Sequence, residues 1–355
     1  MAIRKKPKKE AELAATGQVM TQVMTPDRLA SSLSRIIEVP IRLSVMIWGA
    51  PGIGKSSIVA KVAQDAGIGI VDLRLSQLAP TDLRGLPVAD AGVSRWYPPE
   101  FLPREGRGIL FLDEINMAPP AVQGISQQLI LDRRVGSYVV PDGWFIWAAG
   151  NRSEDHASVF EMPAPLSNRF IHFEVNADFE SFKQYAISCG VHETIIGFLS
   201  FRPSLLHQPD ETRPAWPSPR SWFMANQLYQ SGMSIHPAVG APAAAEFEAY
   251  LEVYRNMPNL DAICAGSESP GFPGEPSARY GVSFGLAIRA QDAKSKRNAL
   301  LWIVGKAPME WQSVFLVDLF RRELKNGTSA AFVSMMRSDN VLKNKLTAFR
   351  DLLIQ

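Results

Sequence analysis

The chain has few cysteines and almost no surplus of charge. Its two cysteines, Cys189 and Cys264, lie far apart and form no CxxC or Cys/His spacing, so we expect neither a disulfide framework nor a zinc site. Thirty-seven basic and thirty-five acidic side chains give a net charge of +2, and residues 1–12 alone contribute +3 from five Lys/Arg and two Glu. The rest of the chain is about neutral, so no overall field attracts nucleic acid.

Long apolar runs are also missing. The runs LSVMIW and GILFL are far shorter than the roughly 20 residues that cross a bilayer. The basic N-terminus is followed by ELAATGQVMTQVMT rather than by an apolar signal core. We therefore expect no membrane insertion, no secretion, and a reducing cytoplasmic location. Residues 1–27 are predicted to form a flexible basic tail, because they combine a charge run with little apolar periodicity.

The body of the chain has the composition of a folded protein, with 46% hydrophobic and 20% charged residues. Its first part contains short apolar runs that are too uniformly apolar for a sheet with one solvated face, so we predict buried parallel strands. These runs are 43–48, 68–73, 108–112, 144–149 and 170–175. Helical patterns at 56–65 and 121–131 lie between them, which indicates an α/β doubly wound core over residues 28–176.

Helical periodicity replaces the strand pattern after about residue 176, as in DFESFKQYAISC and SWFMANQLYQSG. We therefore predict an all-α region over residues 177–355. Two Pro-rich breaks inside it, 201–220 and 264–281, are predicted to be long surface loops.

The segment GAPGIGKS predicts a phosphate-binding loop, because it satisfies G-x-x-x-x-G-K-[ST] between a predicted strand and a predicted helix. Its glycines let successive backbone N–H groups face a phosphate chain at the positive end of the helix dipole. Lys55 is expected to reach the β and γ phosphates of ATP, and Ser56 to bind Mg²⁺. The predicted nucleotide contacts are Gly49, Pro51, Gly52, Ile53, Gly54, Lys55, Ser56 and Ser57.

Two carboxylates follow the apolar strand GILFL, at the carboxyl end where open α/β sheets place their ligands. Asp113 fits a Mg²⁺ carboxylate acting through water, and Glu114 fits the base that polarises the attacking water. The phosphate loop and this acidic pair together predict hydrolysis of a nucleoside triphosphate.

The two motifs resemble those of the AAA+ superfamily, and the resemblance implies roles for further residues. Asn151, after the strand WFIWAAG, matches the sensor 1 position. Arg169, in PLSNRF, matches the arginine finger that reaches the neighbouring subunit's γ-phosphate, and Arg152 is a competing candidate because it directly follows Asn151. A finger supplied by another chain makes hydrolysis depend on assembly.

The helical region offers one more candidate, in the segment WPSPRSW. Ser218 is a plausible N-cap and Pro219 a first helical residue. Arg220 then projects from the start of a lid helix and resembles sensor 2, which contacts the phosphates.

A closer resemblance is to MoxR-type AAA+ ATPases, which include Rubisco-activating and nitric-oxide-reductase-activating chaperones and are related to magnesium chelatase subunits. The segments that carry it are LAPTDLRGLP, RWYPPEFLPREGRGILFLDEIN, APPAVQGISQQLILDRRVGSYVVPDGWFIWAAGN and PAPLSNRF. Many members read DEINRAPP, whereas this chain has Met117 in place of that Arg. The resemblance places two pore-facing insertions at Thr81–Pro99 and Arg134–Trp144, the second with a Pro-Asp-Gly turn between strands.

The resemblance implies a homo-oligomeric ring, a hexamer, that uses ATP and Mg²⁺ to remodel a protein client with a von Willebrand A domain partner. Two alternatives stay open. A nucleic-acid motor or loader would use the same phosphate machinery, although the neutral body argues against nucleic acid as a partner. A slow nucleotide-gated assembly scaffold would bind the same ligand without acting as a motor.

Overall fold

The computed structural model describes residues 23–39, 41–155, 160–210, 212–267, 271–343 and 345. The chain divides into two compact units, one ending at Asp178 and the other beginning at Phe179. Of the predicted basic tail, residues 1–27, the part from 1 to 22 lies outside the described residues. Its last residues are regular structure, since β1 is Val23–Met24 and the helix α2 begins at Pro26, so the ordered body starts before the predicted boundary.

A six-stranded parallel sheet forms the centre of the first unit, with the strand order β1-β10-β2-β9-β6-β3. Its strands after β1 are β2 (Val45–Trp48), β3 (Gly69–Arg74), β6 (Gly108–Asp113), β9 (Trp144–Gly150) and β10 (Ile171–Val175). All five predicted strands are confirmed, with bounds within two residues of those expected. β1 was not predicted, because two residues are too few to show a period.

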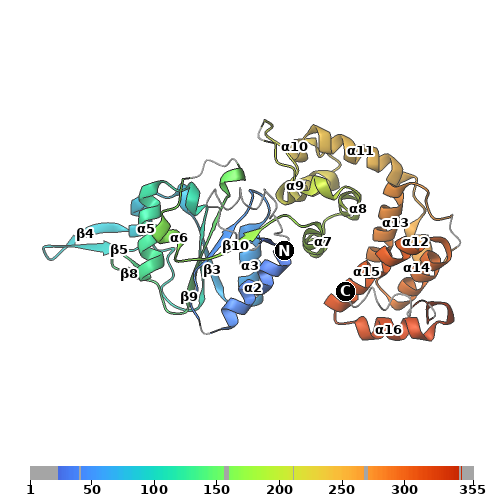
Figure 1. Ribbon diagram of the computed structural model, residues 1–355, viewed down its shortest axis with the longest axis horizontal. Helices are drawn as coiled ribbons and strands as arrows, with labels where there is room; N and C mark the ends of the chain where they lie inside the picture. Colours follow the sequence, from blue (N-terminus) through green and yellow to red (C-terminus); the bar gives the residue numbers. More distant parts are fainter. Residues whose placement is uncertain are drawn as a thin grey trace, which may run out of the picture. The chain divides into compact units, whose positions relative to one another are not determined.

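Helices cover both faces of this sheet, as predicted (Figure 1). They are α2 (Pro26–Glu38), α3 (Lys55–Asp65), α4 (Pro80–Arg84), α5 (Pro120–Asp132) and α6 (Ala164–Ser167). Alternate residues of one strand serve the two faces. In β2, Val45 and Ile47 belong to the core that includes α2 and α3, whereas Met46 belongs to the core that includes α5. The sequence shows no alternation here because both faces are buried.

The strand β3 differs from its prediction as a buried strand, because it lies at the edge of the sheet. Only Leu73 of its residues is buried, and Ile70 is 37% exposed. An edge strand has a hydrogen-bonded neighbour on one side only, here β6, and its apolar composition does not reveal that position.

Two antiparallel hairpins extend from the first unit. β4 (Leu86–Asp90) pairs with β5 (Val93–Tyr97) inside the predicted insertion 81–99. β7 (Arg134–Val135) pairs with β8 (Tyr138–Val139) inside the segment 134–144. The predicted Pro141-Asp142-Gly143 turn is present, with the Trp144 N–H donating to the Pro141 carbonyl at 3.0 Å. It leads from β8 into β9, and the hairpin itself turns at Gly136.

The described residues of the second unit form helices joined by loops, with no strand, as predicted. Its α-helices are α7 (Phe179–Ser188), α8 (Glu193–Phe201), α9 (Pro219–Gln230), α10 (His236–Val239), α11 (Ala241–Arg255), α12 (Leu260–Ala265), α13 (Pro276–Arg289), α14 (Ala293–Lys306), α15 (Met309–Lys325) and α16 (Ser329–Ser338). The predicted loop 264–281 is shorter than expected, because α12 reaches Ala265 and α13 begins at Pro276. Phe272 in that loop packs beside Trp302 and Trp311.

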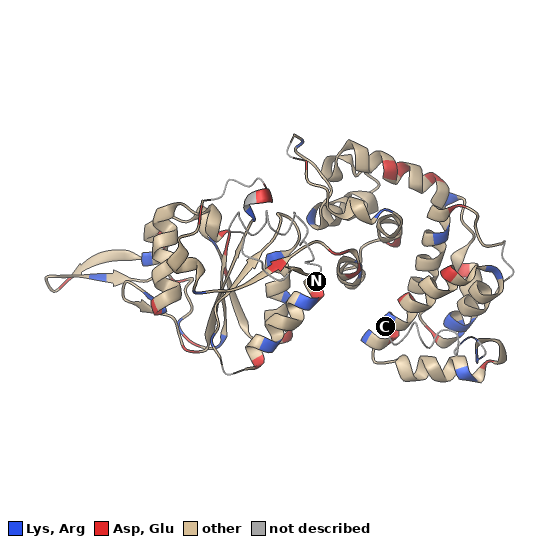
Figure 2. Cartoon of the chain, in the orientation of Figure 1, with Lys and Arg blue, Asp and Glu red and all other residues tan. Residues whose placement is uncertain are grey.

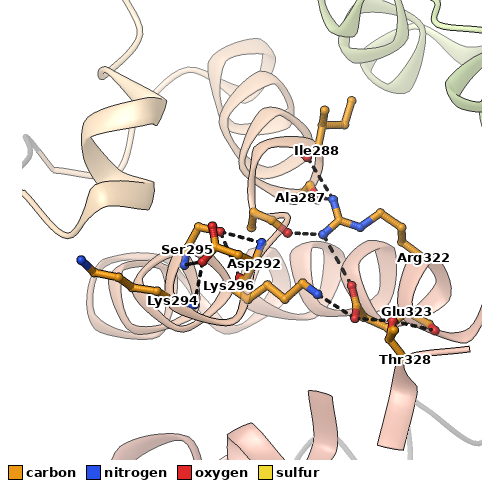
Figure 3. A network of polar contacts seen from close by, with 10 residues as sticks. Ala287, Ile288, Asp292, Lys294, Ser295, Lys296, Arg322, Glu323 and Thr328 are labelled. Atoms are coloured by element: carbon orange, nitrogen blue, oxygen red, sulfur yellow. Dashed lines mark hydrogen bonds and ion pairs between the residues drawn. The ribbon is translucent and has the colours of Figure 1, made fainter. Parts of the chain in front are cut away.

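A buried polar network joins α13, α14 and α15 of this unit (Figure 3). Glu323 is 1% exposed and accepts hydrogen bonds from Lys296 (2.8 Å) and Thr328 (2.7 Å). Arg322 donates to the carbonyls of Ala287, Ile288 and Ala290 at the end of α13. The charged groups of this network are therefore hydrogen-bonded, as buried charges require.

Charged residues of both signs are interspersed over the elements of each unit (Figure 2). Along the described ranges, the structure contains no helix with the length and apolar character needed to span a membrane.

Candidate nucleotide-binding site

The phosphate loop lies between the end of β2 at Trp48 and the start of α3 at Lys55. Gly52 (φ 78°) and Gly54 (φ 96°) have left-handed backbones that favour glycine, and Gly54 is the N-cap of α3. A Cβ on Gly49 would lie 2.6 Å from the Val175 carbonyl oxygen, so this glycine is required by a close approach of β10. The loop therefore precedes the N-terminus of a three-turn helix, where backbone N–H groups and the helix dipole attract phosphate.

The Lys55 ammonium is buried in this loop, with 8% of the residue exposed. It donates to the carbonyls of Gly49 (2.7 Å) and Ala50 (3.1 Å) and to the Oδ1 of Asn151 (2.9 Å). The predicted phosphate lysine and the predicted sensor are thus in direct contact, although they are 96 residues apart.

Ser56 and Asp113, the predicted magnesium residues, are also brought together. The Ser56 hydroxyl donates to the Oδ2 of Asp113 at 2.6 Å, and the Oδ1 of Asp113 accepts from the Glu114 N–H at 2.9 Å. A hydroxyl and a carboxylate are hard oxygen donors of the kind that Mg²⁺ prefers. The described residues hold no group of three His, Cys, Asp or Glu arranged for a metal.

Glu114 lies directly after β6 in the left-handed region, with φ 57° and ψ 34°. This conformation is uncommon for a residue with a side chain. The Oε2 of Glu114 accepts a hydrogen bond from the Ser76 hydroxyl, in the short helix Leu75–Gln77 that follows β3. Ser76 was not predicted, and its position 38 residues from Glu114 gives no sequence signal.

Asn151 is fixed at the end of β9 by a reciprocal pair with Asn116. The Asn116 amide donates to the Asn151 carbonyl at 2.7 Å, and the Asn151 N–H donates to the Oδ1 of Asn116 at 3.1 Å. The Asn151 amide also lies 3.1 Å from the Met117 sulfur. Asn116 was missed as a site residue, although its place two residues after Glu114 could have suggested it.

The two candidate finger residues have different surroundings. Arg152 donates to Glu174 (2.9 Å), Asn176 (2.9 Å) and both oxygens of Asp155 (3.0 and 2.8 Å). The hydrogen bond to Asp155, followed by the contact with Glu174, raises the pKa of Arg152 above its ordinary range despite partial burial. Arg152 is therefore engaged within its own unit.

Arg169 is exposed between α6 and β10, and only its backbone N–H, donating to Leu166 at 3.1 Å, has an interaction among the described residues. The assignment of a finger role to Arg169 stays a prediction.

Arg220 lies in the second unit, exposed in the first turn of α9. The predicted N-cap is confirmed, since the Ser218 hydroxyl accepts from the Ser221 N–H at 3.1 Å. Its predicted contact with nucleotide involves the other unit and stays a prediction.

Comparison with known proteins assigns the class of this domain. Residues 44–170 match the family described as AAA domain (dynein-related subfamily). Together with the parallel sheet and the phosphate loop, this match shows a P-loop AAA+ fold followed by a helical region. Residues 44–170 therefore form a domain of the AAA type, a type that in general binds and hydrolyses nucleotide.

The individual proteins that resemble this chain share little sequence identity with it. A segment of 144 residues is 28% identical to midasin of Giardia intestinalis and spans 37% of this chain and 3% of midasin. The chain is similar to NtrX from Brucella abortus in complex with ADP (17% identity, 96% of this chain and 71% of that chain, TM-score 0.39). It is also similar to a putative ATPase from Cytophaga hutchinsonii (16% identity, 87% and 89%, TM-score 0.36). At TM-scores below 0.5 these likenesses carry no argument about activity.

Proposed function

We propose that this chain is an ATP-hydrolysing subunit of a MoxR-type AAA+ ring, a homo-hexamer that remodels or activates a protein client with a von Willebrand A domain partner. The observation that carries hydrolysis is the convergence of Lys55, Ser56, Asp113, Glu114 and Asn151 at one end of the sheet. The client, partner and ring are supported by the sequence resemblance to MoxR-type proteins.

The phosphate loop supplies binding in this proposal, and Glu114 supplies the base. ATP phosphates lie against the loop N–H groups and Lys55, and Glu114 orients and polarises the attacking water. Ser56 and Asp113, the latter through water, would hold Mg²⁺, and the ion would supply positive charge that neutralises the charge developing on the phosphates. Asn151 acts beside Lys55 at the γ-phosphate, and Arg220 adds a contact from the lid.

Completion of the site requires a second subunit. We assign the completing residue as Arg169, because its side chain is exposed, whereas Arg152 is held by acidic groups of its own unit. An Arg supplied in trans stabilises the charge of the transition state, so hydrolysis per subunit rises with assembly.

The test of hydrolysis is Glu114→Gln in the full chain. We expect turnover to fall by at least about 100-fold while ATP affinity stays within a few-fold, because the base is lost and the phosphate loop is not. Glu100→Gln, an exposed carboxylate after β5, is the matched control and should hydrolyse normally. Wild-type turnover by the Glu114→Gln protein would refute the mechanism.

Affinity purification with the same variant tests the coupling to a protein. The ATP-bound trap should retain a protein client that the wild type releases, and candidate von Willebrand A domain proteins should raise wild-type turnover. Stimulation by DNA would instead establish a nucleic-acid motor. Slow turnover that no partner changes, together with nucleotide-dependent assembly, would establish a scaffold.

A further inference from the structure

His172 on β10 forms a bridge between two segments of the first unit. Its Nδ1 lies 2.9 Å from the Nε1 of Trp48, and its Nε2 lies 2.8 Å from the Ser167 carbonyl oxygen. An indole N–H can only donate and a carbonyl can only accept. The contacts therefore require a neutral imidazole that carries its proton on Nε2. The Trp48 and His172 rings are nearly parallel, with an interplanar angle of 8°.

One end of this bridge adjoins the phosphate loop, and the other adjoins the Arg169 segment. Trp48 is the last residue of β2 and directly precedes Gly49, the first glycine of the phosphate loop. Ser167 is the last residue of α6, two residues before Arg169. The turn from the end of α6 to Arg169 is closed by a hydrogen bond from the Arg169 N–H to the Leu166 carbonyl. Leu166 itself is fully buried.

We propose that His172 is a positioning residue, which holds the Arg169 segment in a fixed place relative to the phosphate loop of the same subunit. This inference rests on the proposed role of Arg169 in trans. A subunit would then present its Arg169 to the neighbouring site through a connection that starts at its own nucleotide loop. Removal of either hydrogen bond leaves Arg169 intact and lowers its ability to complete the neighbouring site.

Mixed assemblies of full-length subunits test this inference. Arg169→Ala subunits keep Glu114 and can hydrolyse only with a finger from a neighbour, whereas Glu114→Gln subunits keep Arg169 and do no chemistry. Mixing them should restore turnover. His172→Phe or Trp48→Phe is then introduced into the Glu114→Gln subunit alone, so the altered subunit contributes only its finger.

The expected result is a fall of about tenfold in the restored kcat with the KM for ATP unchanged, because the hydrolysing site itself is not altered. His172→Gln, whose amide can accept and donate, should recover part of the loss. Ile171→Val on the same strand is the matched control and should have no effect. Nucleotide binding and incorporation into assemblies, measured for each donor subunit, establish that it is folded.

Two contrary results have separate meanings. Full restoration of turnover by donors that carry His172→Phe would overturn the positioning role. No restoration by the simple Glu114→Gln donor would show that Arg169 does not act in trans, which would remove that part of the proposed function and the inference with it.

Discussion

The Lys55 ammonium donates a 2.9 Å hydrogen bond to the Oδ1 of Asn151, which joins the phosphate loop to the end of β9. Both residues are buried, at 8% and 7% exposure. The group that is predicted to hold the phosphates and the group that is predicted to sense them are therefore joined by a direct hydrogen bond. A change at either residue should alter the other.

Asn151→Ala should impair turnover more than binding. The substitution removes a hydrogen-bond acceptor of Lys55 and leaves the phosphate loop backbone intact. We expect kcat to fall by about 10- to 100-fold, which corresponds to about 1.4–2.7 kcal/mol, with ATP affinity within a few-fold of wild type. Steady-state hydrolysis together with binding of a fluorescent ATP analogue measures both quantities. An equal loss of affinity and no loss of kcat would contradict the assignment.

Arg169→Ala and Arg152→Ala should separate catalysis from stability. Arg169 is exposed, so its removal should change the free energy of unfolding by no more than about 0.5 kcal/mol while abolishing assembly-dependent hydrolysis. Arg152→Ala removes the guanidinium that pairs with Asp155 and Glu174 and should destabilise the first unit by about 2–3 kcal/mol. Urea unfolding and the dependence of specific activity on protein concentration provide the measurements. The reverse pattern would make Arg152 the finger.

Two glycines should respond oppositely to alanine. Gly49→Ala places a Cβ 2.6 Å from the Val175 carbonyl oxygen, so we expect a destabilisation of about 1–3 kcal/mol from the forced shift and weaker ATP binding. Gly124 lies in α5, and apart from its chain neighbours and the local helix backbone no atom lies within 4 Å of an added Cβ. Gly124→Ala should therefore stabilise the chain by about 0.5–1 kcal/mol through helix propensity. Thermal unfolding of both variants tests the contrast.

Glu323 should make the stability of the second unit depend on pH. Burial alone raises the pKa of its carboxyl group, but hydrogen bonds from Lys296 and Thr328 outweigh burial and lower the pKa below its ordinary 4.5. A lowered pKa in the folded state contributes stability that is fully present above pH 4.5 and is lost as the pH falls through the folded value.

Glu323→Gln should consequently lower the free energy of unfolding by up to about 3 kcal/mol at pH 7. The difference from wild type should shrink below pH 4.5, where the wild-type carboxyl group becomes neutral as well. Denaturant unfolding of the full chain across this pH range measures the difference, with the exposed Glu248→Gln as control. A difference that does not change with pH would exclude the ion pairs as its source.

Much of the fold could be predicted because its strands are nearly uniform apolar runs and its phosphate loop has fixed spacing. The edge position of β3 could not be predicted, because the composition of a strand does not reveal whether it has one hydrogen-bonded neighbour or two. The candidate nucleotide residues were predicted from local motifs, and the fold brings Lys55, Ser56, Asp113 and Asn151 into contact as pairs. Their other partners were not predicted, since Ser76 lies 38 residues from Glu114 and Asn116 lies 35 residues from Asn151. The difference between Arg152 and Arg169 depends on the contact with Glu174, which only folding creates.

The backbone of Glu114, with its φ of 57°, places a base at a position that glycine or asparagine would occupy with less strain. A redesign guided by stability alone would replace it. We expect the product to be a more stable domain that would still bind nucleotide but would no longer hydrolyse it. Glu114 therefore combines an unfavourable backbone conformation with the carboxylate that we assign to catalysis. Strained positions often occur at functional sites in this way.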